Sequence, residues 1–103
     1  MTNTRLDILR GMVVSNPGDS FARYGLAMEC VTSGKLQEAV DEFRTLLEAN
    51  PKYPAAYFHC GQALEKLGKI EDARALYQKG IEVTTAMGDT HTRSELQAAL
   101  DIL

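Results

Sequence analysis

The sequence of this chain repeats itself at an interval of 34 residues, and this repeat limits the possible folds more than any other feature. The segment 34–39, with the sequence GKLQEA, recurs at 68–73 as GKIEDA, and the pair Asn-Pro at 16–17 recurs at 50–51. Where identity is lost, volume and polarity still recur, as Phe43 and Tyr77 illustrate. A fixed period of this length is typical of supersecondary units that stack and bury one continuous core.

Helical spacing runs through every unit. In one segment the apolar residues follow the i, i+3, i+4, i+7 pattern of an amphipathic helix: Leu36, Ala39, Val40, Phe43, Leu46 and Leu47. Gly34 and Gly68 precede two such helices, and glycine readily adopts the left-handed conformation that ends the helix before it. The pattern predicts an all-α fold with helices over 4–15, 19–33, 36–49, 54–67, 70–87 and 90–102.

The repeat also divides the chain. Leu9 aligns with Phe43 and Val13 with Leu47, so we expect residues 4–15 to form half of a unit. Residues 20–53 and 54–87 are then two full repeats. The segment 89–103 is expected to be a capping helix, with Asp89 or Thr92 as its N-cap and a polar outer side that shields the end of the stack. The prediction is one continuous domain over 1–103.

The positions that recur resemble the signature of the tetratricopeptide repeat family. The first unit has Leu26, Ala27, Cys30, Gly34, Ala39, Phe43, Leu46 and Pro51, and the second has Tyr57, Gly61, Leu64, Gly68, Ala73, Tyr77, Gly80 and Ile81. Three positions depart from it: Arg23 replaces an aromatic residue, Cys60 a leucine and Thr85 the closing proline. The resemblance implies an α-solenoid of antiparallel helical hairpins and a role in binding a protein or peptide.

In this family the first helix of each unit lines a concave face, and the resemblance therefore implies where a ligand would bind. The candidate binding residues are aromatic, sulfur-containing or polar: Phe21, Tyr24, Met28, Phe58, His59, Gln62 and Lys66. Aromatic and methionine side chains are common anchors on peptide-binding surfaces. The expected function is a non-catalytic adaptor whose protein or peptide partner is unknown.

A second interpretation of the apolar residues is packing within the chain or against a second copy. Phe21 and Val31 suit this interpretation better than they suit a ligand groove, whereas Tyr24, Met28 and Phe58 suit both equally. The half repeat also has an apolar side, formed by Leu6, Ile8, Leu9 and Val13, that the predicted stack does not cover fully. The alternative function is therefore a self-associating scaffold protein, such as a homodimer.

Charge and hydropathy exclude other classes of partner. The chain has a formal net charge of -3 and has no basic stripe, so we expect no binding to nucleic acid. Charged residues interrupt the apolar run near the N-terminus, and we expect neither a signal peptide nor a membrane span. Cys30 and Cys60 are predicted to be buried free thiols in a reducing compartment, which favours the cytoplasm.

Catalytic and metal-binding motifs are missing from the sequence. His59 and His91 are the only histidines, and neither has a cysteine or carboxylate at the spacing of a metal site. Glycine-rich phosphate loops and nucleophile elbows are also absent. The sequence therefore predicts no enzyme activity, no cofactor and no metal.

Overall fold

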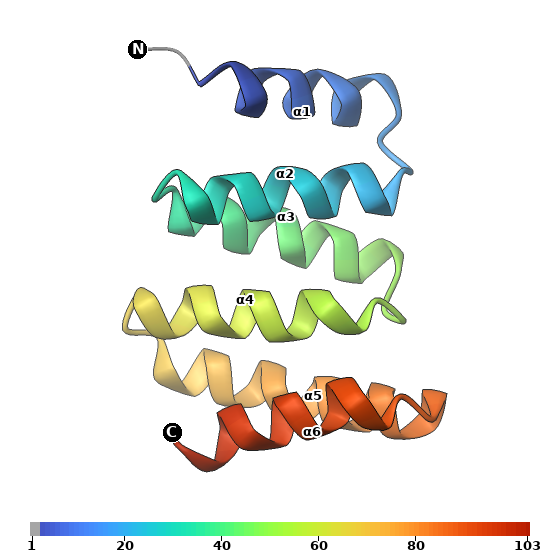
Figure 1. The fold of residues 1–103 in the computed structure, drawn as a ribbon, viewed down its shortest axis with the longest axis vertical. Coiled ribbons are helices and arrows are strands. Elements are labelled where there is room, and N and C mark those ends of the chain that lie inside the picture. The colour runs from blue at the N-terminus through green and yellow to red at the C-terminus, as the bar shows by residue number, and fades with distance from the viewer. Residues whose placement is uncertain (1–2) are drawn as a thin grey trace.

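The computed structural model describes residues 3–103, and over that range it is a stack of six α-helices (Figure 1). The helices are α1 (Thr4–Ser15), α2 (Ser20–Thr32), α3 (Leu36–Ala49), α4 (Pro54–Lys66), α5 (Ile70–Met87) and α6 (Thr90–Asp101). Each lies within one residue of its predicted bounds. The predicted all-α solenoid is confirmed.

Local signals in the sequence set the ends of these helices. Asn3, Asp19 and Asp89 are N-caps, and the side chain of each accepts a hydrogen bond of 3.1 Å from the backbone N–H three residues later. Gly34 and Gly68 both have φ of 76°, the left-handed conformation that ends α2 and α4 and turns the chain back. Each turn joins two antiparallel helices into a hairpin.

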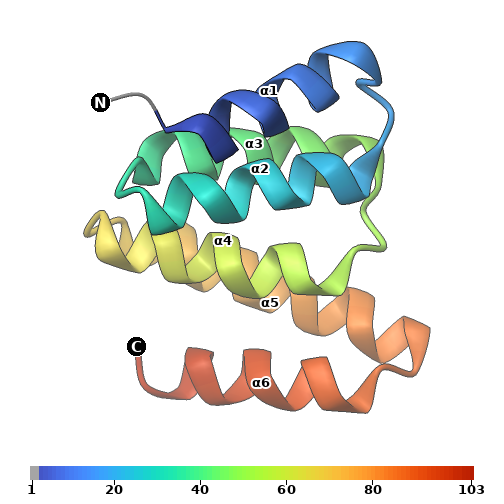
Figure 2. The same cartoon turned by 45° about the horizontal axis from the view of Figure 1, so that its top comes forward.

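The helices form two rows. Figures 1 and 2 show α2, α4 and α6 in front, with α3 and α5 behind them and α1 at the N-terminal end. We call the surface of α2, α4 and α6 the front face, and that of α3 and α5 the rear face. Helices adjacent in sequence pack together, and α4 also contacts α2 and α6. The front row therefore brings side chains from both repeats and the last helix onto one surface.

The contact between α4 and α5 requires a glycine. Tyr77 of α5 is fully buried, and its hydroxyl donates a hydrogen bond to Glu65 and accepts one of 2.8 Å from the amide of Gln62. Its ring lies so close to Gly61 that a Cβ there would be 2.1 Å from Cε1 of the ring. Because both partners of the hydroxyl belong to α4, the ring is held over the backbone of that helix.

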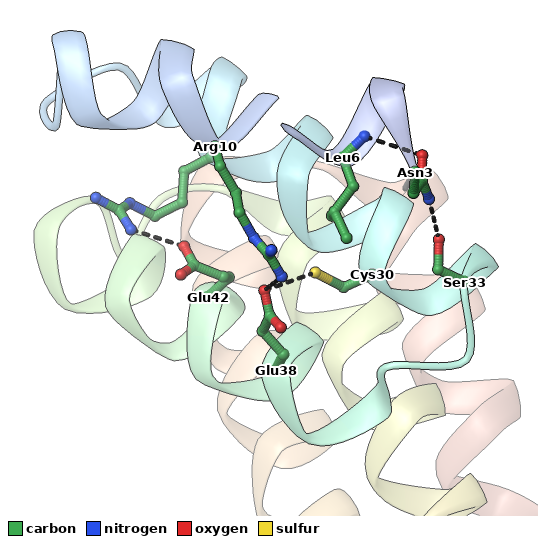
Figure 3. Close-up of polar contacts among 8 residues, drawn as sticks. Asn3, Leu6, Arg10, Cys30, Ser33, Glu38 and Glu42 are labelled. Atoms are coloured by element: carbon green, nitrogen blue, oxygen red, sulfur yellow. Dashed lines mark hydrogen bonds and ion pairs between the residues drawn. The ribbon is translucent and has the colours of Figure 1, made fainter. Parts of the chain in front are cut away.

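The first helix is attached by a few apolar and several polar contacts (Figure 3). The expected uncovered side of Leu6, Ile8, Leu9 and Val13 is wrong in part, because Leu6 and Val13 are buried against the rest of the chain and only Ile8 is exposed. The side chain of Asn3 donates a hydrogen bond of 2.7 Å to the hydroxyl of Ser33. Further along α1, Arg10 forms an ion pair with Glu38 of α3, which keeps the pKa of that carboxyl below its usual range. These contacts fix the rotation of α1 about its own axis.

Both cysteines are buried free thiols, as the sequence predicted. Burial raises the pKa of Cys30 to about 12, and Glu38, which accepts a hydrogen bond of 3.6 Å from this thiol, adds to the increase. Burial also raises the pKa of Cys60 to about 12. Since the thiolate is the reactive form, neither cysteine has the chemistry of a nucleophile in the folded chain.

We predict that both thiols of the native chain resist iodoacetamide at pH 8 and react after unfolding in urea. Mass spectrometry after a timed reaction measures the extent of alkylation. Rapid labelling of either cysteine without denaturant would contradict the burial and the raised pKa described here.

The helical glycines provide a matched pair of stability tests. We expect Gly61→Ala to destabilise the fold by about 1 to 3 kcal/mol, because the held ring of Tyr77 leaves no room for a methyl group. A Cβ at Gly11 of α1 would meet no other atom within 4 Å. At a concentration where the chain is monomeric, Gly11→Ala is therefore expected to be neutral or to stabilise the chain by up to about 1 kcal/mol through helix propensity.

Urea unfolding followed by circular dichroism measures both changes. Equal stability of Gly61→Ala and the wild type would show that the packing of α4 on α5 is looser than described.

Candidate functional site

The seven candidate residues lie on the two middle helices of the stack. Phe21, Tyr24 and Met28 are on α2, and the others, Phe58, His59, Gln62 and Lys66, are on α4. The side chain of Phe21 is 77% exposed and Lys66 is also exposed, whereas the other five are half-buried. None of them is buried in the core, so all seven keep some solvent-accessible surface.

One hollow of about 400 Å³ lies along α2 where α1 flanks the front face. Its lining residues are Arg5, Phe21, Tyr24, Gly25, Met28, Glu29 and Thr32. Arg5 and Glu29 form an ion pair of 3.3 Å between the two helices. This hollow thus combines an apolar and aromatic wall with a charged pair.

A second hollow of about 410 Å³ lies between α4 and α6. Its lining residues are Phe58, Gln62, Glu95, Ala98, Ala99 and Ile102. Ile102, directly after α6, is 82% exposed. The contribution of α6 was missed because its polar residues were interpreted as a cap, although the spacing of Glu95, Ala98, Ala99 and Ile102 indicates one helical side.

Aromatic rings lie between the two hollows. The ring centroid of Tyr24 is 6.1 Å from that of His59, and the ring of His59 is 5.3 Å from that of Phe58. Tyr24 also packs against Phe43 and Tyr53, with centroid distances of 6.1 and 5.3 Å. Tyr24 is therefore part of the core as well as part of the front face.

The environment sets the charge of His59. Burial lowers the pKa of this imidazole, and the nearby carboxylate of Glu95 opposes the shift only in part. His59 is accordingly neutral near pH 7, with one ring nitrogen as a donor and the other as an acceptor. It offers polar recognition on a largely apolar surface.

Gln62 has a structural role that the sequence did not reveal. Its amide nitrogen donates to the hydroxyl of Tyr77 at 2.8 Å and lies 3.4 Å from the carboxylate of Glu65. The structure thus brings Tyr24, Phe58 and His59 together, places Phe21 and Met28 in the first hollow, and places Gln62 at the wall of the second. Lys66 lies at the C-terminal end of α4.

The rear face has two smaller hollows, of about 300 and 260 Å³, which share Pro51 and Lys79. Met87 lines the first of them and is partly exposed. Sequence reasoning did not assign residues to this side. It provides a control surface for experiments on the front face.

Residues 3–103 contain neither a metal-type cluster of side chains nor a membrane-spanning helix. In that range no three or more His, Cys, Asp or Glu side chains are grouped closely enough to hold a metal ion. Within the same range, none of the helices combines the length and the apolar character needed to cross a membrane.

Comparison with known proteins places this fold among named relatives. The sequence model of the tetratricopeptide repeat family matches residues 22–86 of this chain. The solution structure of a tetratricopeptide repeat domain protein from Salinibacter ruber is 38% identical, with a TM-score of 0.77 over 82% of this chain and 86% of that one. A TPR repeat-containing protein of Pseudomonas aeruginosa is 24% identical over 92 residues, which are 89% of this chain and 88% of the relative.

A more distant likeness extends over nearly the whole chain. The crystal structure of PcrH in complex with the chaperone binding region of PopD has a TM-score of 0.88 at 15% identity, over 94% of this chain and 74% of that one. This likeness concerns the fold alone. The family match over residues 22–86, together with the Salinibacter structure, confirms the resemblance recognised in the sequence: the chain belongs to the tetratricopeptide repeat family.

Proposed function

We propose that this chain is a non-catalytic interaction module that binds a peptide or a segment of another protein on its front face. The observation that carries the proposal is the pair of hollows, each of about 400 Å³, that flank the rings of Tyr24, His59 and Phe58. Two recesses with aromatic and aliphatic walls can each accept an apolar side chain from one bound segment.

The residues of the proposed binding surface fall into two groups, apolar anchors and polar groups. Phe21, Met28, Phe58 and Ile102 are the proposed apolar anchors, since they are exposed or half-buried and line the two hollows. Tyr24, Gln62, Glu95, neutral His59 and the cationic Lys66 supply polar groups that fix the register of a bound backbone. These are the features of a pocket with an apolar floor and a few polar groups.

The organisation of the chain supports the same proposal. Residues 20–53 and 54–87 are the proposed repeats, and they supply α2 and α4, while the half repeat 4–15 and the capping helix 89–103 flank them. The structure of PcrH holds the chaperone binding region of PopD, so a protein of this fold can bind a segment of another protein. The buried free thiols favour a reducing location, which we propose is the cytoplasm.

The test is a set of peptides selected from a random displayed library on the immobilised chain. We expect the double variant Phe21→Ala, Ile102→Ala to weaken their binding by about tenfold or more, because one anchor is lost from each hollow. Both side chains are highly exposed, so the fold is retained, which circular dichroism verifies. Tyr24 is avoided because its ring also packs in the core.

Met87→Ala on the rear face is the matched control and is expected to leave affinity unchanged. Fluorescence anisotropy measures each dissociation constant. Peptides that bind the double variant as tightly as the wild type, or that are weakened only by Met87→Ala, would contradict the proposal.

A further inference from the structure

The first helix is apolar on two opposite sides. Leu6 and Val13 face the stack and are buried. On the other side Ile8 is 59% exposed and Val14 is 79% exposed, and Met12 is exposed as well. A helix at the edge of a stack needs only one apolar side. The outer side of α1, formed by Ile8, Gly11, Met12 and Val14, therefore has no role within the part of the chain that the structure describes.

The position of α1 in the stack is also unusual. The helix α3 packs between α2 and α4, and α5 packs between α4 and α6. Across residues 3–103, the backbone of α1 approaches that of α2 alone (Figure 1). Its outer side faces away from the rest of the described chain.

Gly11, at the centre of that outer side, is an exception among the helical glycines. A Cβ at Gly25 would contact Leu9, one at Gly61 would overlap Tyr77, and one at Gly80 would lie 2.8 Å from Tyr57. A neighbouring helix thus leaves no room for a Cβ at Gly61 or Gly80, and at Gly25 it would be in ordinary contact with one. At Gly11 the same methyl group would meet nothing within 4 Å. Glycine disfavours the helical conformation, and no contact within the single chain explains its presence at position 11.

We propose that the outer side of α1 is the interface between two copies of this chain, in which α1 crosses α1 of the partner subunit in antiparallel orientation at Gly11. Glycine at a helix crossing permits the close approach of two backbones. Ile8 and Val14 each lie three residues from Gly11, on either side of it. A two-fold axis at Gly11 therefore sets Ile8 opposite Val14 of the partner subunit, and one surface complements itself.

The charges of α1 distinguish the antiparallel crossing from a parallel one. Arg5 and Arg10 are already held by Glu29 and Glu38 of their own chain, the latter pair visible in Figure 3. Exposed Asp7 lies four residues before Gly11 and Ser15 four residues after it. The antiparallel crossing sets the Asp7 carboxylate opposite the hydroxyl of Ser15 of the partner subunit, whereas a parallel crossing would oppose two carboxylates. This interface is separate from the hollows of the front face and does not depend on the proposed peptide site.

Cysteine crosslinking tests the crossing point. In the full chain, Gly11→Cys places a thiol on the two-fold axis, within the Cα separation of about 4.4 to 6.8 Å that a disulfide needs. Thr4→Cys on the same helix is the matched control. Thr4 lies seven helical residues from the axis, so the two introduced cysteines of a dimer would be about 20 Å apart. The native Cys30 and Cys60 are buried and do not compete.

Under mild oxidation we expect Gly11→Cys to form a covalent dimer on a denaturing gel at least tenfold faster than Thr4→Cys. Equal rates for the two variants would overturn the proposal. Light scattering on the wild type over about two decades of concentration is expected to show twice the mass of one chain at the upper end.

Val14→Glu places a charge in the proposed interface and should remain monomeric over the same range with an unchanged circular dichroism spectrum. Ile102→Glu, at the opposite end of the stack, is the control and should dimerise as the wild type does. A wild type that is monomeric throughout, or a Val14→Glu variant that dimerises normally, would overturn the proposal.

Discussion

The contact on which the rest of the structure depends is the packing of Tyr77 over the backbone of Gly61. The ring can occupy this place only because position 61 has no side chain, and its hydroxyl is bound by Gln62 and Glu65 of the same helix. This contact sets the rotation of α4 relative to α5. Once α4 is fixed, Phe58 is directed towards α6 and His59 towards Tyr24, so the front face follows from a contact behind it.

The helices could be predicted from the sequence because their signals are local. Gly34, Gly68 and the Asp89 cap each act within a few residues, and the 34-residue period repeats such local patterns along the chain. What could not be predicted depends on how helices lie against one another. Arg23, which stands where an aromatic residue is usual, pairs with Glu42 at 2.7 Å and so joins α2 to α3. The hydrogen bond of Gln62 to Tyr77 joins α4 to α5 in the same way.

The candidate site also combines residues that the sequence could predict with residues that depend on how the helices pack. Tyr24 and Phe58 were identified because they recur at one register of the repeat. Ile102 and Glu95 have no counterpart in an earlier unit, so their place beside Phe58 emerged only when α6 was seen against α4. The separation of the surface into two hollows likewise depends on how α1 lies against α2 and α6 against α4. The first helix contributes to both proposed surfaces. Arg5 lines one hollow of the front face, and Gly11 marks the proposed crossing of two copies.

The most direct measurement of the central claim is a titration of the isotope-labelled chain with a selected peptide, followed by backbone NMR shifts. If the front face is the binding site, the shifts will concentrate on α2, α4 and α6, around Phe21, Phe58 and Ala98. Shifts that cluster instead on α3 and α5, around Lys79 and Val83, would contradict the account, because they would place the partner on the rear face.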